Sequence, residues 1–230
     1  MVTFLTSYSE YTLSKPLLKG VFILKNKLQL IIQLLFLALF VVLIVTGPVQ
    51  IWVGLFLLGV VGSLFLGRIY CGWICPINTV MNGVTWLKKK AGLKKQAVPR
   101  ELTSSWIRYL VLALFIAAFT FSMITGRPIP ALPILFAAGI ILTFFFPEEL
   151  WHRYLCPYGT ILSLPAKISK YTLFVDQEKC SSCGICKKVC PAGAVELNDN
   201  IYTIKKNSCL VCLDCSRSCK ENAISYVMSS

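Results

Sequence analysis

The fold is decided by residues 180–191, CSSCGICKKVCP, together with residues 209–219, CLVCLDCSRSC. Both runs space four cysteines as C-x2-C-x2-C-x3-C. A tight loop of this spacing reaches only three iron corners of a cubane cluster, so the fourth ligand must come from the other run. The doubled spacing therefore predicts a small α+β domain of the bacterial two-cluster [4Fe–4S] ferredoxin type over residues 171–230.

The crossover of the fourth cysteine fixes the expected ligands. One cluster is assigned to Cys180, Cys183, Cys186 and Cys219, and the second to Cys209, Cys212, Cys215 and Cys190. Paired zinc sites are the alternative, but zinc prefers two C-x2-C pairs for each ion, whereas three evenly spaced cysteines with a remote fourth suit a cubane. Short strands are expected at residues 173–175, 195–197, 202–204 and 224–226, with a turn at 198–200.

The composition of the rest of the chain points to a lipid environment. Of 230 residues, 56% are hydrophobic and only 14% are charged, yet the net charge is +13. A soluble protein this apolar has too little polar surface to cover itself. The excess of lysine and arginine is typical of loops held on the cytoplasmic side of a membrane, and no basic stripe with aromatic residues indicates nucleic-acid binding.

Four apolar stretches predict a membrane α-helical domain of four transmembrane helices. They cover residues 28–46, 51–66, 107–124 and 131–146, and short Gly- and Pro-containing turns join them into two helical hairpins. The second and fourth stretches are short, so each helix is expected to continue into the motif that follows it. The predicted domains are an interfacial N-terminal segment (1–27), the transmembrane domain (28–170) and the ferredoxin-like domain (171–230).

The basic residues predict the orientation of these spans. Lysines precede the first span, a run from Lys88 to Lys95 follows the second, and Arg153 follows the fourth, while only Arg127 lies in the opposite loops. The positive-inside rule then places both termini and the ferredoxin domain in the cytoplasm, in a multi-pass protein of the inner membrane. The run from Lys88 to Lys95 is interpreted as lying beside anionic lipid rather than as a docking patch for an acidic partner.

The membrane domain contains a repeat of its own. RIYCGWICP at residues 68–76 follows the second span, and WHRYLCP at residues 151–157 follows the fourth. Aligning the two Cys-Pro pairs gives a parallel repeat with two i, i+4 ligand pairs on helical faces. The paired residues are Cys71 with Cys75 and His152 with Cys156.

These four residues are expected to meet at the cytoplasmic mouth of the helices. Pro76 and Pro157 suit the first turn of a following helix, so two helix N-termini would point at the same anionic group. A third iron–sulfur cluster is the favoured occupant of this Cys3His pocket. An unliganded structural neck and a zinc or copper ion are the alternatives.

Aromatic and basic side chains near the motifs have a simpler interpretation than ligand binding. Trp73, Trp151, Tyr154 and Tyr158 are assigned to an aromatic belt at the bilayer surface ahead of a quinone pocket. Arg68 and Arg153 are likewise explained by the positive-inside rule ahead of any contact with a headgroup.

Taken together, the chain resembles the NapH/NosR-type membrane ferredoxins. The resemblance rests on the transmembrane helices, on the cysteine and proline positions of the two motifs and on the two-cluster segment. It implies oxidation of a quinol and onward transfer of electrons to a partner subunit. The chain departs from the family pattern at His152, where the family has cysteine.

The leading functional hypothesis is a membrane-anchored electron-transfer subunit that connects the quinone pool, or a membrane partner, to a redox partner protein. No nucleophile–base pair, phosphate loop or flavin motif is present, so no catalytic residue is assigned and substrate chemistry is expected in another subunit of an oxidoreductase complex. A maturation or regulatory protein, acting in metal-site assembly, cupric reduction or redox sensing, is the alternative. A purely structural anchor is the third hypothesis.

Overall fold

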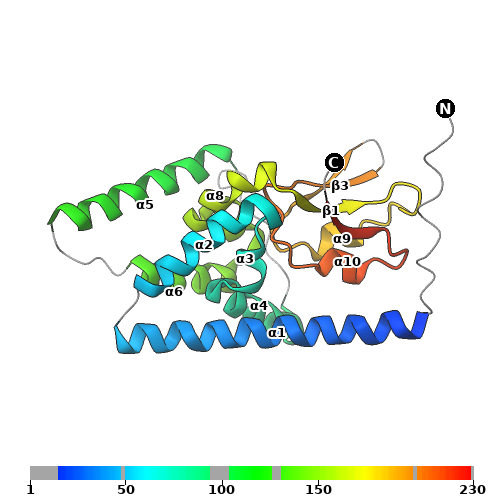
Figure 1. The fold of residues 1–230 in the computed structure, drawn as a ribbon, viewed down its shortest axis with the longest axis horizontal. Helices are drawn as coiled ribbons and strands as arrows, with labels where there is room; N and C mark the ends of the chain where they lie inside the picture. Colours follow the sequence, from blue (N-terminus) through cyan, green and yellow to red (C-terminus); the bar gives the residue numbers. More distant parts are fainter. Residues whose placement is uncertain (1–14, 48–49, 94–103, 126–130, 199–200, 229–230) are drawn as a thin grey trace.

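The structure is a computed structural model that describes residues 15–47, 50–93, 104–125, 131–198 and 201–228. Side chains of the first helix are described from Lys27 onward. Helices form one end of the molecule, and a small domain of strands and short helices forms the other (Figure 1). The predicted turns at 126–130 and 199–200, and the basic residues Lys94, Lys95, Arg100 and Arg127, lie outside the described residues.

Four long helices correspond to the predicted apolar stretches. They are α1 (Lys15–Thr46), α2 (Gln50–Leu66), α5 (Ser105–Thr125) and α6 (Ala131–Phe145). Within the described residues, Lys27–Thr46 is long and apolar enough to cross a membrane by itself, and the other three contribute shorter apolar helices. The helical region therefore has one candidate span near the N-terminus, and the four-span arrangement stays a prediction.

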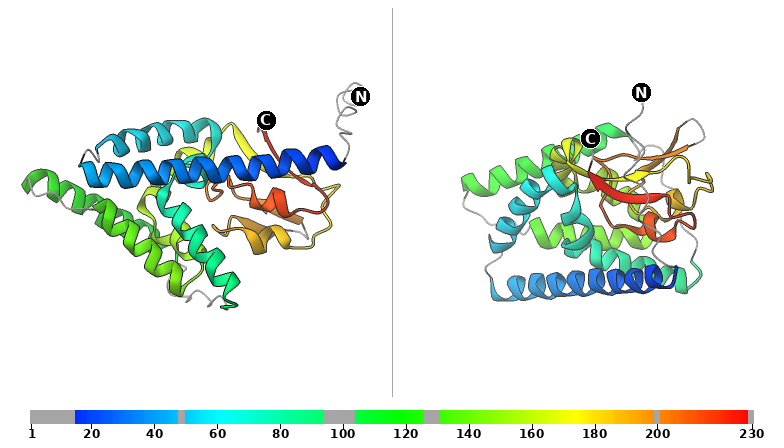
Figure 2. Two further views of the ribbon diagram at one scale, coloured as in Figure 1. Left: turned by 90° about the horizontal axis from the view of Figure 1, so that it is seen from below. Right: turned by 45° about the vertical axis from the view of Figure 1, so that its right-hand side comes forward.

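The predicted boundary between an interfacial segment and the first span has no counterpart in the backbone. Helix α1 continues without a break from Lys15 to Thr46 and runs alongside both ends of the molecule in two views (Figures 1 and 2). Large aliphatic side chains face outward along α1, α2 and α5: Leu35 is 65% exposed, Leu58 70% and Ile124 80%. Water would not tolerate so much contiguous apolar surface, whereas lipid does.

The expectation that the second and fourth spans continue into their motifs is wrong. Helix α2 ends at Leu66, and Gly67 follows with a left-handed φ of +67°, a conformation that commonly terminates helices. Helix α6 ends at Phe145, just before Pro147, which disfavours a helical residue ahead of it. Both motifs therefore lie on separate short elements.

These short elements follow the same order in the two halves. After α2 come α3 (Ile69–Trp73) and α4 (Pro76–Lys90). After α6 come α7 (Glu148–Leu150), the π-helical turn η2 (Trp151–Leu155), α8 (Pro157–Ser163) and the 3-10 turn η3 (Pro165–Ile168). In each half, a proline at the first helical position starts the second helix, as predicted.

The core of the helical region lies between the two halves. Ile77 and Met81 of α4 pack with Trp151 against the inner face of α6. Gly139 of α6 permits this approach, because a Cβ there would lie 2.8 Å from Ile77 and 3.2 Å from Trp151. At the far end, Phe40 of α1 stacks edge-on against Trp52 of α2. The two motifs are thus held on a common packed base.

The C-terminal domain has the predicted strands. β1 (Tyr171–Val175) pairs antiparallel with β4 (Ile224–Met228), and β2 (Val195–Asn198) pairs antiparallel with β3 (Ile201–Ile204). Two short helices that the cysteine spacing did not predict, α9 (Ile185–Val189) and α10 (Asp214–Ser218), each begin within a cysteine run. The two runs therefore occupy equivalent positions in a two-sheet domain.

Polar contacts fix this domain to the end of α2. The Lys170 amide donates to the Leu64 carbonyl at 3.3 Å, and the Tyr226 hydroxyl donates to the Leu66 carbonyl at 2.8 Å. These bonds satisfy carbonyl groups in the last turn of α2 that have no partner within the helix. As a result, the ferredoxin-like domain sits directly against the membrane motifs.

Candidate iron–sulfur sites

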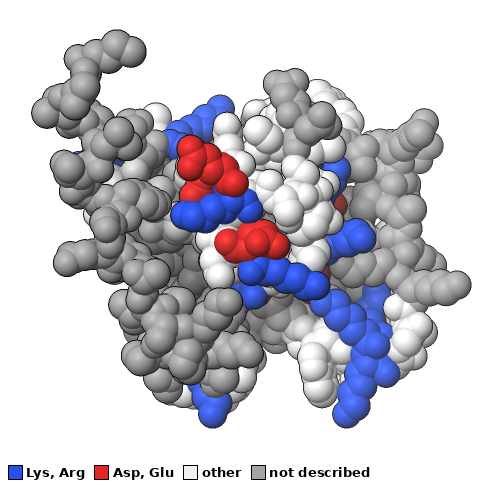
Figure 3. Space-filling view, turned by 90° about the vertical axis from the view of Figure 1, so that its right-hand side faces the viewer, with Lys and Arg blue, Asp and Glu red and all other residues white. Residues whose placement is uncertain are grey.

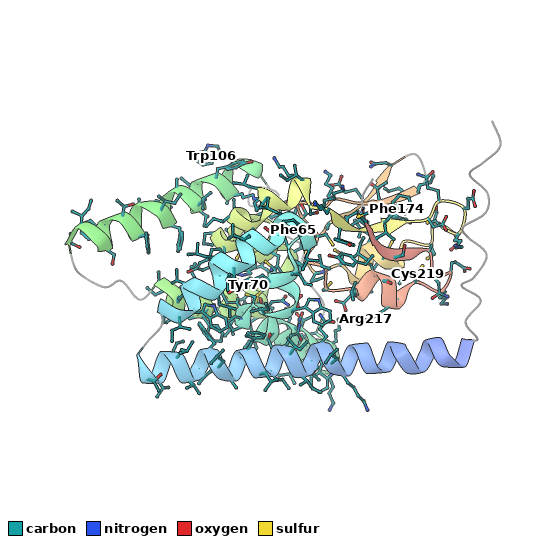
Figure 4. All side chains as sticks on the ribbon, viewed as in Figure 1. Phe65, Tyr70, Trp106, Phe174, Arg217 and Cys219 are labelled. Carbon is teal, nitrogen blue, oxygen red and sulfur yellow. The ribbon has the colours of Figure 1, made fainter. Side chains whose placement is uncertain are left out.

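The first predicted cysteine set lines one cavity. Its walls include the four cysteines assigned to the first cluster, with β-strand residues, Gly184 and Tyr202 behind them. Cys183 is exposed, and its three partners are half-buried. Cys219, contributed by the other run, lies at the outer part of the domain (Figure 4). The structure therefore brings Cys219 into the same cavity as Cys180, Cys183 and Cys186, as the crossover predicts.

The second predicted set lies deeper in the domain. Cys209 and Cys215 are buried, and Cys190 acts electrostatically on Cys209, Cys212 and Cys215. Burial raises the pKa of the Cys209 thiol to about 11, and the nearby Cys190 acts in the same direction. Thiols crowded and desolvated in this way ionise only when a cation compensates them, which is what an iron cluster provides.

Left-handed backbone marks equivalent positions of the two cysteine loops. Ser182 and Gly184 in the first loop have φ of +52° and +73°, and Val211 and Leu213 in the second have +54° and +65°. A β-branched residue such as Val211 rarely adopts this conformation, so the second loop stores strain. The turn points the Val211 amide at the Cys209 sulfur, 3.4 Å away. Amide donors of this kind stabilise an anionic cluster.

The membrane motifs converge on a third group of cysteines. Cys71 and Cys156 are buried, and Cys75 interacts electrostatically with both. The expected i, i+4 arrangement on helical faces is wrong. Cys75 and Cys156 have extended backbone and precede the first turns of α4 and α8, while Cys71 lies on α3 and His152 on η2. We call Cys71, Cys75 and Cys156, with the buried His152 as their predicted fourth partner, the motif pocket.

The two halves of the motif pocket are built alike. The amides of Cys75 and Cys156 each donate 2.9 Å bonds to the carbonyl five residues earlier. The hydroxyls of Thr79 and Thr160 each donate back to the Cys75 and Cys156 carbonyls, at 3.2 and 3.1 Å. The sequence contains this signal as a repeated C-P-x-x-T, which extends the Cys-Pro pairs by a position that spacing arguments about ligands overlook. These matched bonds support an internal duplication.

Unpaired polar atoms surround the motif pocket. Among the described side chains, Arg68 Nε, Asn78 Oδ1 and His152 Nε2 are buried without a hydrogen-bond partner. Arg68 contacts Cys71, Asn78 follows Cys75 on α4, and His152 is the predicted fourth ligand on η2. Buried polar atoms normally have a hydrogen-bond partner. Three such atoms without a partner near one cysteine group therefore fit a bound polar or charged species.

The arrangement does not favour a single metal ion. Within the described part of the chain, no three His, Cys, Asp or Glu side chains are grouped closely enough for one ion. A cubane tolerates wider spacing, because its ligands surround four separate irons. Three cysteines, the predicted ligand His152 and the unpaired polar atoms are a donor set that suits an anionic iron–sulfur cluster.

The motif pocket abuts the second cysteine loop. A Cβ on Gly72 would overlap the Leu210 carbonyl and would lie 3.2 Å from the Cys212 amide. Beside it, the indole of Trp73 donates a 3.0 Å hydrogen bond to the Val211 carbonyl. Only glycine permits this backbone approach, so α3 is pressed directly onto the loop that carries Cys209 and Cys212.

A polar cavity of about 340 Å³ lies between α1, α4 and α10. Its lining consists of Gln29, Leu30, Gln33, Asn82, Cys212, Asp214 and Arg217. Arg217 reaches from α10 towards α1 and donates to Gln29 Oε1 at 2.6 Å (Figure 4), and it also forms an ion pair with Asp214. The cavity is therefore close to neutral, and its other polar groups are amides.

The sequence assignments of the aromatic and basic residues need correction. Trp151 and Tyr154 are buried in protein rather than placed in an aromatic belt, and Trp73 binds the ferredoxin loop. Arg68 is only 2% exposed, so it is not a solvated cytoplasmic charge. Trp151 packs between α4 and α6, whereas Trp73 meets the ferredoxin domain, so these motif aromatics are covered by protein on two different sides.

Arg153 belongs to an ion-pair network between the two regions. It contacts Glu149 and Glu196, each at 3.4 Å, and donates to the Gly193 carbonyl at 3.0 Å. Lys205 forms a second ion pair with Glu196. Basic and acidic side chains alternate on the end of the molecule formed by the ferredoxin domain (Figure 3). Arg153 thus connects η2 to β2 and to the loop before it.

Comparison with known families agrees with both cysteine regions. A family model described as a 4Fe-4S binding domain matches residues 48–94 and again residues 128–172, which contain the two membrane motifs. A second 4Fe-4S binding domain model matches residues 173–196. One model matching two consecutive segments is the pattern that an internal duplication produces.

The relatives include an archaeal protein whose name states no function and several proteins with ferredoxin-type names. It is 31% identical to MJ0749 of Methanocaldococcus jannaschii over 74% of this chain and 68% of that protein. It is 30% identical to the ferredoxin-type protein NapH of Haemophilus influenzae, over 65% of this chain and 58% of the relative. The chain belongs to the NapH-type membrane ferredoxin family.

Other members of the NapH-type family differ in size. The chain is 30% identical to NirI of Paracoccus denitrificans but covers only 25% of that protein, and it covers about half of YccM of Escherichia coli. No solved structure matches the chain. Membership of this family establishes an iron–sulfur protein of electron-transfer type. The partners and substrates of the individual relatives are properties of those proteins and are not assigned to this chain.

Proposed function

We propose that this NapH-type protein is a four-span subunit of the inner membrane, with both termini in the cytoplasm, that carries electrons between the quinone pool or a membrane partner and a redox partner protein. The contact between Gly72 and the Leu210–Cys212 backbone carries the proposal. It puts the motif pocket, at the end of the apolar helices, against the second cysteine set.

Three ligand groups would then follow one another through the molecule. The motif pocket would hold one cluster, Cys190 with the second run would hold another, and the outer set with exposed Cys183 would hold the third. Cys190 and Cys212 pack with Cys71 and Cys75 in a single apolar cluster, which supports this order. The exposed position of Cys183 suits exchange with a partner protein.

The polar cavity supports a quinol as the small-molecule reactant. It opens beside Leu30, at the end of the apolar part of α1, and Cys212 forms part of its wall. Since Asp214 neutralises Arg217, the cavity suits a neutral headgroup with hydroxyl or carbonyl groups rather than a phosphate. Clusters held by Cys212 and its partners would accept the two electrons of quinol oxidation one at a time, and the two protons would pass to solvent at the open side of the cavity.

Metal analysis provides the direct test of the cluster assignment. Iron and acid-labile sulfide, counted on the anaerobically purified protein, are expected at about twelve per chain for three cubanes and about eight if the motif pocket is empty. A colourless, iron-free protein would refute the proposal. Labelling of the ferredoxin domain from outside intact cells would refute the orientation.

Substitution of Asn82 tests whether quinol binds in the polar cavity. Asn82 lines it, and none of the hydrogen bonds described above involves its side chain, so Asn82→Leu replaces a polar group of the cavity wall by an apolar group of similar shape while leaving those bonds intact. We expect Asn82→Leu to slow reduction of the clusters by a short-chain quinol about tenfold, with reduction by dithionite unchanged. Asn82→Ser, which keeps a polar group, is the matched control. Equal rates in both variants would place quinol elsewhere.

A further inference from the structure

Arg68 is a buried cation without a carboxylate beside it in the described part of the chain. It lies between α2 and α3, is 2% exposed, and is one of the largest fully buried side chains. Within the described residues, no carboxylate lies within ion-pair distance of it. Its Nε also lacks a hydrogen-bond partner. A buried charge normally requires an opposite charge close by.

The neighbours of Arg68 are thiols from two different cysteine groups. Its Nη2 lies 3.8 Å from Cys71 Sγ, and a Cβ on Gly159 would lie 2.5 Å from the same nitrogen, which places the guanidinium beside Cys156. Its Nη1 donates to the Asn207 carbonyl at 3.3 Å, two residues before Cys209. Arg68 is thus wedged between the motif pocket and the second cysteine set.

Electrostatics agree with this placement. The guanidinium contacts Cys71, lies beside Cys156 and reaches the backbone just before Cys209, in a setting from which water is excluded. A guanidinium stays charged under all ordinary conditions. It therefore favours negative charge on both cysteine groups at once.

We infer that Arg68 is the shared buried counter-charge of the motif-pocket centre and the second-set centre, and that it raises the reduction potential of both. The inference rests on the proposed iron–sulfur function. Reduction adds one negative charge to a centre, and a fixed cation nearby stabilises the reduced state most strongly where water is excluded. Arg68 acts through the cysteines as a tuning residue and contacts no substrate.

The test is an EPR-monitored redox titration of the purified full-length protein and three variants. Arg68→Gln removes the charge, Arg68→Lys keeps it, and Arg153→Gln removes a charge that is paired and partly solvated. We expect Arg68→Gln to shift the reduction equilibrium of both inner centres about tenfold towards the oxidised form, or about 59 mV lower for a one-electron couple. Arg68→Lys and Arg153→Gln are expected to keep the wild-type potentials.

The outcomes separate this inference from the proposed function. Wild-type protein without iron would refute the function. Wild-type protein with clusters, but with unchanged potentials in Arg68→Gln, would overturn the role of Arg68. If Arg68→Gln assembles no inner clusters, the iron content of Arg68→Lys shows whether the positive charge is required. Recovery of iron in Arg68→Lys supports a requirement for the charge, and failure to recover it shows that guanidinium geometry alone matters, which overturns the inference.

Discussion

Replacing Gly72 by alanine perturbs the contact on which the proposed function rests. The added Cβ overlaps the Leu210 carbonyl and comes to 3.2 Å from the Cys212 amide, and these are backbone atoms that cannot rotate away. Overpacking of this kind costs about 1–3 kcal/mol. Loss of the neighbouring bond from Trp73 to Val211 adds about 1 kcal/mol, and the better helix propensity of alanine returns about 1 kcal/mol.

The net loss of about 1–3 kcal/mol is measurable by hydrogen exchange. Amides of the Leu210–Cys212 loop are expected to exchange about 5- to 150-fold faster in Gly72→Ala, since 1.4 kcal/mol corresponds to a factor of ten. Gly83→Ala on α4 is the matched control, because a Cβ at Gly83 meets nothing within 4 Å. If Gly72→Ala exchanged like Gly83→Ala, the motif pocket would not be pressed against this loop.

Three further predictions follow. Cys190→Ser should lose about four irons and the same EPR signal that Cys209→Ser loses, although Cys190 belongs to the first run. Loss of the signal of the cluster assigned to Cys180, Cys183 and Cys186 would instead mean that Cys190 binds with its own run. Trp73→Phe removes the 3.0 Å bond to Val211 and should loosen the second loop by about 1 kcal/mol in hydrogen exchange, so unchanged exchange would contradict the contact. A hydrogen bond from Lys205 holds the pKa of the Glu196 carboxyl below its usual range. This stabilisation is present above the unfolded-state pKa of about 4.3 and is lost as pH falls through the lower folded value. Below about pH 4.5 the Tm of the wild-type protein should therefore fall more steeply than that of Glu196→Gln. The difference should correspond to about 0.5 kcal/mol after solvent screening. Parallel curves of Tm against pH would argue against the ion pair.

Local chemistry made the ferredoxin domain predictable. Cysteine spacing is set by the size of the cluster, so the two C-x2-C-x2-C-x3-C runs are sufficient to predict both loops and their crossover. Strand positions followed from alternating apolar residues between turn signals. The family model confirms a 4Fe-4S binding domain at residues 173–196, and the pairing of β1 with β4 and of β2 with β3 confirms the strands; the ligand crossover stays a prediction.

Helix boundaries near the motifs were not predictable in the same way. Hydropathy indicated where the apolar helices lie, but it placed both motifs on continuations of α2 and α6. Gly67 and Pro147 end those helices, and Cys75 and Cys156 have extended backbone ahead of new helices. An interruption of one or two residues in a helix changes which side chains share a face. Hydrophobic periodicity is read over a longer window, so it does not detect such an interruption.

The sequence by itself determined the predicted cysteine ligands, the apolar helices and the duplicated Cys-Pro motifs, because each depends on spacing along the chain. Only the tertiary structure decided that Gly72 touches the Cys212 loop and that Arg68 is buried between two cysteine groups. Those contacts join residues about 140 positions apart. They depend on how the ferredoxin domain docks on the helices, which local propensity does not encode.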